Sequence, residues 1–242
     1  MGKCLVLAGI KGGVGKSTIA VNLAVAAART GYGRVVIADL DSQESAMSWA
    51  GERAGSDRAS GAVTTVRLAG KAVRAELARL RETYDLVIAD PPGRDSDIQR
   101  MALLGADVAL LPFPPRPFDV WTDGKAVRML TEVATVNQAL RSLAFVNMAR
   151  AQGSDAEAAE EALREATEAW QVLDARVGLR VAFSNAIGLG LSALEVREPD
   201  ALAVQEIAAL WSRVDMALDG TLPAGPLPPV APAATPSQEN PA

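Results

Sequence analysis

Histidine is absent from this 242-residue chain, and cysteine occurs once, as Cys4. Because histidine is the commonest general base and metal ligand, any acid–base chemistry falls to carboxylates, lysines or water held by the backbone. A single thiol excludes an internal disulfide and a Cys-x-x-Cys pair. Cys4 lies in an apolar run and is most simply a small buried residue, which agrees with a reducing cytosol.

The sequence also lacks an uninterrupted apolar segment of the length needed to cross a bilayer. A glycine-rich stretch begins at residue 9, so we expect no secretory signal peptide at the amino terminus. The net charge is −5 and the isoelectric point is about 5.0. This composition argues against a protein that is basic as a whole and binds nucleic acid through bulk charge, but it leaves room for a local basic patch.

Hydrophobic residues make up 49% of the chain, enough for one domain with a sizeable core. The composition changes after residue 218, because half of the fourteen prolines lie between residues 220 and 242. We therefore expect a single domain over residues 1–218 and a disordered or extended tail over residues 219–242. The tail is not a basic amphipathic helix, so we expect no attachment to a membrane surface.

A glycine-rich turn connects the first expected strand, residues 4–8, to the first expected helix, residues 16–30. Glycine permits backbone angles closed to other residues, so successive N–H groups can converge on one anion at the positive end of the helix dipole. The pattern predicts a phosphate cradle in which Lys16 reaches the β- and γ-phosphates and the Ser17 hydroxyl ligates Mg²⁺. The alternative is an accidental turn rich in glycine and lysine. The expected nucleotide-binding residues of the turn are Lys11, Gly12, Gly13, Val14, Gly15, Lys16, Ser17 and Thr18.

Two further apolar runs end in acids: residues 34–39, followed by Asp41, and residues 84–90, which end in Asp90. Open parallel sheets bind ligands at the carboxyl ends of their strands, and alternate residues of an extended segment point the same way. We therefore expect Asp39 and Asp41 to project together toward the phosphates. Asp90 has the place of a Walker B aspartate, and we expect Asp39 and Asp90 to act on Mg²⁺ through water. For Asp41 the alternative is a cap of the next helix.

Strands and helices alternate along the rest of the chain. The remaining expected helices cover residues 44–53, 71–82, 96–104, 120–137, 155–173 and 201–218. The remaining expected strands cover residues 62–67, 107–111, 142–147 and 177–183. This alternation, with acids and glycines at the ends of strands, predicts an α/β fold with a doubly wound, mostly parallel sheet and helices on both faces.

The turn matches the deviant Walker A motif K-G-G-x-G-K-[ST], and on it the chain resembles the ParA/MinD family of P-loop ATPases. The strict Walker A pattern fails because Ile10 occupies the place of its first glycine. The resemblance implies that Lys11 crosses a dimer interface and contacts the phosphates bound by the other subunit. It also implies that Asp41, in a segment usually written D-x-D-P-Q, positions or activates the water that attacks the γ-phosphate. Ser42 replaces the proline of that segment.

Two more segments resemble the small plasmid-partition ParA proteins, often called ParF-like. A proline-rich stretch matches the P-x-x-P-S-P-x-D segment at their dimer face, with Arg116 in place of serine; a rigid connector is the alternative. The matching residues are Pro112, Pro115, Pro117 and Asp119. Asn147 ends an expected strand and resembles the residue of the family that contacts the base, because an amide can read an adenine edge. A turn-forming asparagine is the alternative.

The resemblance covers roughly residues 3–217 and implies a Mg²⁺-dependent ATPase that binds ATP and ADP. With ATP it would form a sandwich homodimer that binds DNA without sequence preference, until a ParB-like or other adaptor protein stimulates hydrolysis. Such cycles distribute plasmids, chromosome regions or protein cargos over the nucleoid in the cytoplasm. The candidates for a DNA-binding face are Arg150, Arg176, Arg180 and Arg197. Isolated arginines that are merely solvated are the alternative.

Two other functional classes remain open. One is a metabolic kinase or ligase of the same superfamily that acts on a small molecule, and the other is a scaffold that uses ATP only as a dimer switch. Iron-protein reductases and cluster carriers need bridging cysteines, which Cys4 alone does not supply. Tyrosine kinases of this fold carry a tyrosine-rich tail, whereas this chain has only Tyr32 and Tyr84. Stimulation of ATP hydrolysis by nonspecific DNA distinguishes the classes.

Overall fold

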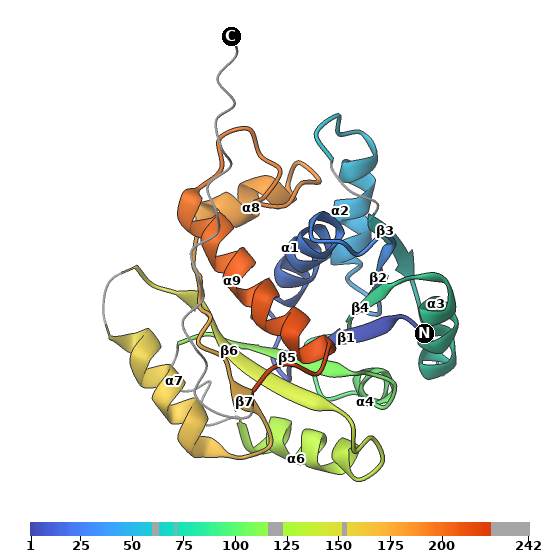
Figure 1. Ribbon diagram of the computed structural model, residues 1–242, viewed down its shortest axis with the longest axis vertical. Helices are drawn as coiled ribbons and strands as arrows, with labels where there is room; N and C mark the ends of the chain where they lie inside the picture. Colours follow the sequence, from blue (N-terminus) through green and yellow to red (C-terminus); the bar gives the residue numbers. More distant parts are fainter. Residues whose placement is uncertain (60–62, 71, 116–122, 152–153, 224–242) are drawn as a thin grey trace.

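The computed structural model describes residues 1–59, 63–70, 72–115, 123–151 and 154–223, arranged as Figure 1 shows. The described strands are β1 (Lys3–Leu7), β2 (Val35–Asp39), β3 (Val63–Arg67), β4 (Leu86–Asp90), β5 (Val108–Phe113), β6 (Arg141–Ala149), β7 (Gln171–Val172) and β8 (Val177–Gly178). The described helices are α1 (Lys16–Arg29), α2 (Ser45–Ala54), α3 (Val73–Thr83), α4 (Asp97–Leu103), α6 (Asp123–Ala134), α7 (Asp155–Ala166), α8 (Val181–Ile187) and α9 (Ala201–Leu218).

The described strands form one sheet in the order β3-β2-β4-β1-β5-β6-β7, and β8 pairs with β6. Every pairing among them is parallel, which confirms the predicted class. The chain moves to one side of β1 to form β2 and β3, and to the other side to form β5 and β6. Sheets of this kind bind ligands at the carboxyl ends of the strands, where the direction of winding changes. The turn after β1 lies at that point.

Helices cover both faces of the sheet, as the sequence predicts (Figure 1). Successive residues of β1 point to opposite sides: Leu5 and Leu7 belong to one core, and Cys4 and Val6 to the other. Helices α1, α2, α8 and α9 contribute to the first core, and α3, α4, α6 and α7 to the second. Because both faces are buried, the central strands are continuous apolar runs, as is typical of parallel sheets.

The register of the sheet brings the two predicted acidic strand ends together. Asp39 at the end of β2 lies directly opposite Asp90 at the end of β4. On its other side, β4 pairs with β1, whose end leads into the glycine-rich turn. Parallel pairing therefore gathers both acids and the turn at one edge of the sheet.

Two of the predicted elements are wrong in part. The expected strand over residues 177–183 is only the two-residue β8, after which α8 begins at Val181. Phe183, Ala186 and Ile187 have the three- and four-residue spacing of a helix face, and they pack on the first core. The expected helix over residues 155–173 ends at Ala166 and is followed by β7. In both places short apolar runs fit a strand as well as a helix, so tertiary packing decides.

Helix α9 ends at Leu218, where the sequence predicts the domain to end. Residues 224–242 of the predicted tail lie outside the described residues, so the division at residue 218 stays a prediction. With 18 residues, α9 is the longest described helix, and it buries Ile207, Leu210 and Val214 in the first core. Among the described residues, no helix combines the length and the apolar character required to span a membrane.

Candidate nucleotide-binding site

The turn between β1 and α1 has the backbone of a phosphate cradle. Gly13 and Gly15 have φ angles of +72° and +87°, a conformation that residues with a side chain rarely adopt. A Cβ atom at Gly15 would also lie 2.5 Å from the side-chain nitrogen of Asn147. No side chain caps α1 at Gly15, so the first N–H groups of the helix remain available to an anion.

Two residues that follow β4, Gly93 and Gln99, contact this turn. Gly93 approaches it so closely that an added Cβ would lie 2.6 Å from the Lys11 carbonyl oxygen and 2.9 Å from the Gly12 nitrogen. The side-chain oxygen of Gln99, which is fully buried in α4, accepts a hydrogen bond from the Gly9 N–H group at 3.0 Å. The sequence analysis missed both residues. A glycine directly after the Pro91-Pro92 pair was a usable signal for Gly93, whereas nothing local marks Gln99.

A cavity of about 440 Å³ opens over the turn. Its lining includes most of the predicted phosphate-binding residues, namely Gly12, Gly13, Gly15, Lys16, Ser17 and Thr18. Asp41 also lines it, so the predicted catalytic aspartate and the cradle border the same cavity. Half-buried Lys11 immediately precedes Gly12. The residues that complete the lining are Val21, Gln43, Ser45, Trp49, Gly93 and Ile187.

The buried charges beside the cradle are unevenly compensated. Asp90 is 1% exposed, and neither of its carboxylate oxygens accepts a hydrogen bond from a described residue. Burial raises the pKa of Asp90 to about 6, although the nearby Ser17 hydroxyl and Lys16 ammonium lower it. Burial also lowers the pKa of Lys16, against the attraction of Asp90 and Asp41. An unpartnered buried carboxylate is unfavourable unless a cation or a water completes it.

Asp90 and Ser17 fit a hydrated Mg²⁺ ion. Mg²⁺ prefers oxygen ligands and keeps several of its waters, so it needs few direct protein ligands. The Ser17 hydroxyl oxygen can ligate the ion directly. The two oxygens of Asp90 can accept hydrogen bonds from the waters that the ion keeps. The described part of the chain contains no group of three or more acidic, histidine or cysteine side chains that would form a fully protein-ligated metal centre.

Asp39 and Asp41 do not project together. Asp39 is fully buried, and its two oxygens accept hydrogen bonds from the N–H groups of Asp41 at 3.1 Å and Met47 at 3.0 Å. Burial raises the pKa of Asp39, and these backbone bonds lower it. Asp39 therefore anchors the start of α2, while Asp41 faces the cavity and accepts a hydrogen bond from Gln43 N–H at 3.1 Å. The expectation that both acids point alike is wrong because the strand ends at Asp39 and the chain turns.

Asn147 contacts the cradle from β6. Its side-chain nitrogen donates a hydrogen bond to the Val14 carbonyl oxygen at 2.7 Å, and the residue is 3% exposed. The next residue, Met148, has a φ angle of +58° at an irregularity in the pairing of β6 with β8. Its terminal methyl carbon would lie 3.3 Å from a Cβ added to Gly15. Asn147 thus holds the turn, and contact between its amide and a base stays a prediction.

The predicted dimer segment is described only in part. Pro117 and Asp119 lie outside the described residues. Pro112 is buried inside β5, which is longer than predicted and pairs with β6 through Phe113. The partner strand β1 ends opposite Leu110, so the missing N–H of Pro112 lies beyond the β1 ladder. Pro115 follows the strand and is half-buried.

The four predicted DNA-binding arginines fall into two pairs. Arg176 binds Glu157 and Glu160. Arg180 donates to both oxygens of Glu206, through Nε at 2.8 Å and Nη2 at 2.6 Å. These carboxylates raise the pKa of both arginines and balance their charge. Arg150 and Arg197 are exposed and form no ion pair with a described residue. Of the four predicted arginines, only Arg150 and Arg197 therefore carry positive charge that no described acid compensates.

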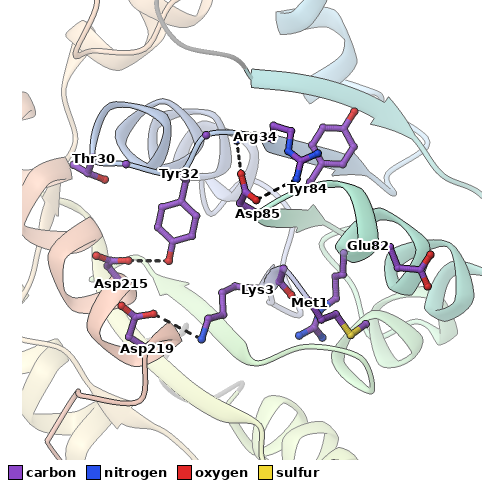
Figure 2. A pocket seen from close by; sticks show the side chains of 14 residues that line it. Met1, Lys3, Thr30, Tyr32, Arg34, Glu82, Tyr84, Asp85, Asp215 and Asp219 are labelled. Atoms are coloured by element: carbon purple, nitrogen blue, oxygen red, sulfur yellow. Dashed lines mark hydrogen bonds and ion pairs between the residues drawn. The ribbon is translucent and has the colours of Figure 1, made fainter.

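A larger cavity, of about 600 Å³, lies at the opposite edge of the sheet, where the strands begin. Figure 2 shows that most of its charged side chains are already paired. The Tyr32 hydroxyl donates to Asp215 at 2.9 Å, and Arg34 lies 3.5 Å from Asp85. Lys3 lies 3.7 Å from Asp219. The lining has no glycine cradle at a helix start, so we place the functional site at the carboxyl edge.

A doubly wound parallel sheet with a glycine cradle after its central strand defines a P-loop nucleotide-binding protein. Residues 5–193 match the family described as the CobQ/CobB/MinD/ParA nucleotide binding domain, and the chain belongs to this family. The match includes the cradle, Asp41, Asp90 and Asn147.

Two relatives carry names that describe positioning. Maintenance of carboxysome distribution protein A of Halothiobacillus neapolitanus is 26% identical over 211 residues, which cover 87% of this chain and 95% of that protein. The chromosome-partitioning ATPase Soj of Thermus thermophilus is 33% identical over 168 aligned positions, which cover 59% of this chain and 67% of Soj.

Solved structures share the fold. An aspartate-to-alanine variant of Cyanothece McdA in complex with ATP has a TM-score of 0.71 at 18% identity, covering 90% of this chain and 96% of that one. Cobyrinic acid a,c-diamide synthase from Mycobacterium smegmatis, with an ATP analogue and magnesium bound, has a TM-score of 0.70 at 18% identity, covering 89% and 95%. At these identities the likeness establishes the fold, which metabolic and positioning proteins have in common.

Proposed function

We propose that the chain is a Mg²⁺-dependent ATPase of the ParA type, which forms a homodimer around ATP and positions a cargo on DNA. The observation that carries the proposal is the cavity in which the K-G-G-x-G-K-S turn faces Asp41, with the unpartnered Asp90 behind Ser17. A triphosphate would bring negative charge to the cradle, and Asp90 lies where a hydrated cation would accompany it.

Each residue then has a separate task in hydrolysis. The N–H groups from Gly12 to Lys16 hold the phosphate oxygens, and Lys16 balances their charge. Asp41 orients the attacking water from the opposite wall. Ser17 and Asp90 would hold Mg²⁺ and its waters, and the bound ion would supply charge neutralisation at the phosphates. Catalysis of this kind consists of positioning and electrostatic stabilisation, so the absence of histidine from the sequence is no obstacle.

The dimer completes the site in this proposal. Lys11 of each subunit contacts the phosphates of the other, and the proline segment that includes Pro112 and Pro115 contributes to the dimer face. DNA binds without sequence preference through exposed arginines, for which Arg150 and Arg197 are the first choice because their charge is uncompensated. An adaptor protein stimulates hydrolysis, and the protein is associated with the nucleoid in the cytoplasm. The names of the carboxysome-distribution and chromosome-partitioning relatives support a positioning role.

The decisive experiment measures ATP hydrolysis by the purified full chain with and without nonspecific duplex DNA, over a range of salt concentrations. We expect ATP-dependent DNA binding that weakens steeply with salt, because phosphate contacts release counterions. Paired Arg150→Ala and Arg197→Ala substitutions should weaken binding, and Arg176→Ala is the matched control because that guanidinium is already neutralised. No DNA binding with ATP at low salt would contradict the proposal.

The same measurement separates the alternatives. A metabolic kinase or ligase, which the shared fold of the diamide synthase keeps in view, would hydrolyse or transfer phosphate without responding to DNA. A scaffold switched by ATP would dimerise and bind DNA without turnover.

A further inference from the structure

The loop between α8 and α9 lies between α1 and α2, the two helices that carry the proposed active site, and contacts both. Residues 188–195 contain no charge except Glu195, and residues 190–193 are buried. On one side the loop contacts α1, which begins at the cradle. On the other side it contacts α2, which begins just after the turn that carries Asp41. The loop lies more than 130 residues after both helices, so no local sequence pattern indicates this role.

A buried ion pair joins α2 to the loop. Arg53, in the last turn of α2, donates to both oxygens of Glu195 at 2.9 Å, and it donates to the Gly190 carbonyl oxygen at 3.1 Å. The side chains of Arg53 and Glu195 are 8% and 1% exposed. The Ser192 N–H group also donates to a carboxylate oxygen of Glu195, at 2.9 Å, and this bond within the loop stabilises its conformation. Two-pronged arginine–carboxylate contacts fix direction as well as distance.

Trp49 and Gly190 tighten the same contact. The Trp49 indole N–H donates to the Leu191 carbonyl oxygen at 3.1 Å, and the guanidinium of Arg53 lies 4.8 Å from the centre of the indole ring. Gly190 has a φ angle of +67°, and a Cβ atom added there would lie 2.1 Å from the backbone nitrogen of Arg53. Trp49 is also part of the cavity wall, so the contact reaches the site itself.

The other side of the loop is fastened to α1. Asn22 is fully buried in α1, where its side-chain oxygen accepts a hydrogen bond from Ala193 N–H at 2.9 Å. Its nitrogen donates to the carbonyl oxygen of Thr18 at 2.8 Å. One asparagine therefore links the loop to a residue that lines the cavity.

We infer that Arg53 and Glu195 are positioning residues, which hold α2 at a fixed place relative to α1 and so set the position of Asp41 opposite the cradle. The inference rests on the proposed ATPase function. Asp39 fastens the start of α2 through the Met47 N–H group, and Arg53 fastens its end. The Asp41–Gln43 turn lies directly before this helix, so its place follows from both attachments. Asp41 must orient a water, for which small displacements matter greatly.

The test compares the buried Arg53–Glu195 pair with a second two-pronged arginine–carboxylate pair, in which only the arginine is buried. Glu195→Gln keeps the shape of the side chain and removes its charge, and Arg53→Lys keeps the charge but loses the two-pronged contact. The matched control is Asp174→Asn, because Arg213 binds both Asp174 oxygens at 2.9 Å between α9 and the segment after β7. Neither control residue lines the cavity. Each variant is examined by thermal unfolding, ATP affinity, turnover and amide hydrogen exchange.

In Glu195→Gln we expect turnover to fall roughly tenfold or more while ATP affinity changes less than about twofold, because the cradle is intact and only Asp41 is displaced. Exchange at the Asp41 and Met47 amides, which Asp39 binds, should become faster. Arg53→Lys should recover part of the turnover. Asp174→Asn should lower the melting temperature and leave turnover and these two amides unchanged.

Equal turnover in Glu195→Gln and Asp174→Asn, with equal exchange at both amides, would overturn the inference and leave the proposed function intact. Failure of the unsubstituted chain to hydrolyse ATP would instead refute the proposed function, and the exchange measurement would still decide whether the loop positions α2. If the ion-pair variants do not fold, Trp49→Phe keeps an aromatic ring at this position and removes the indole hydrogen bond to Leu191. Faster exchange at the Asp41 amide supports the inference, and unchanged exchange contradicts it.

Discussion

The cavity at the carboxyl edge of the sheet measures about 440 Å³, and the cavity at the amino edge measures about 600 Å³. The smaller one has two glycines in a left-handed conformation and borders on a buried acid without a hydrogen-bond partner. The larger one is lined by charged side chains most of which are already paired, as Asp215 is with Tyr32. Volume alone would therefore select the amino edge, whereas uncompensated charge favours the carboxyl edge.

The difference between the edges lies in uncompensated charge. At the amino edge, the protein satisfies most of its own charged groups, and a ligand would have to displace partners that the chain supplies. At the carboxyl edge, the cradle N–H groups and Asp90 are left for something else to satisfy. Such groups reduce the stability of the free protein and become favourable when the ligand arrives, which is typical of functional sites. The following substitutions test this contrast, from the largest expected effect to the smallest.

The largest effect is expected from Lys11→Ala. A trans-acting positive charge on a transferring phosphate contributes on the order of a thousandfold in rate. We expect ATP-dependent dimerisation to be lost and turnover to fall by about that factor, as measured by size exclusion with ATP and by phosphate release. Lys3→Ala at the amino edge is the control and should change neither. Unchanged dimerisation of Lys11→Ala would remove its trans role.

Asp41→Ala should separate binding from hydrolysis. Removing the group that orients the water lowers turnover by roughly a hundredfold or more, whereas the cradle still binds ATP. The ATP-bound dimer should therefore accumulate and persist, which sizing experiments and retention of labelled ATP would detect. Asp85→Ala at the amino edge serves as the comparison. Wild-type turnover in Asp41→Ala would exclude this residue from catalysis.

Asp90→Asn should stabilise the metal-free protein and weaken its activity. The pKa of Asp90 is raised to about 6 in the folded state, so folding is penalised once the group ionises. The penalty grows as the pH rises from about 4 to 6 and is on the order of 2–3 kcal/mol above that range. Urea unfolding without Mg²⁺ should show the variant more stable at pH 7.5 and nearly equal to wild type near pH 4. A variant less stable than wild type at pH 7.5 would contradict the assignment.

The smallest effect is expected from Arg34→Ala. Its ion pair with Asp85 is exposed, with side chains 61% and 45% accessible, and such pairs contribute less than about 1 kcal/mol. Chemical unfolding should change by no more than this amount, and ATP binding should not change. A loss of ATP binding in Arg34→Ala would mean that the amino-edge cavity takes part in function.

The sequence was sufficient to predict the sheet class, the cradle and the order of its acidic residues. Apolar runs that end in Asp39 and Asp90 are local patterns, and the spacing of the glycines and lysines in the turn is specific. Local patterns failed where the chain changes direction. The turn after Asp39 separates its side chain from that of Asp41, and α8 replaces an expected strand because Phe183 and Ala186 pack on the first core.

Contacts between distant segments could not be predicted from spacing at all. Glu195 is an ordinary acid in the sequence, and only the folded chain shows that it lies against Arg53 in α2. The same holds for Arg176 and Arg180, which the sequence presents as available charges and the fold pairs with acids. A charge can be assigned to a partner only when both its own element and the facing element are placed.

The central place of β1 has a consequence for biosynthesis. Among the described strands this one pairs with β4 and β5 alone, so residues 3–7 gain their neighbours in the sheet only when residues 86–113 have left the ribosome. At about 5–20 residues per second, translation of that intervening length takes several seconds. Throughout this interval the apolar residues 4–7 lack both neighbouring strands, and chaperones that bind apolar segments have time to engage them.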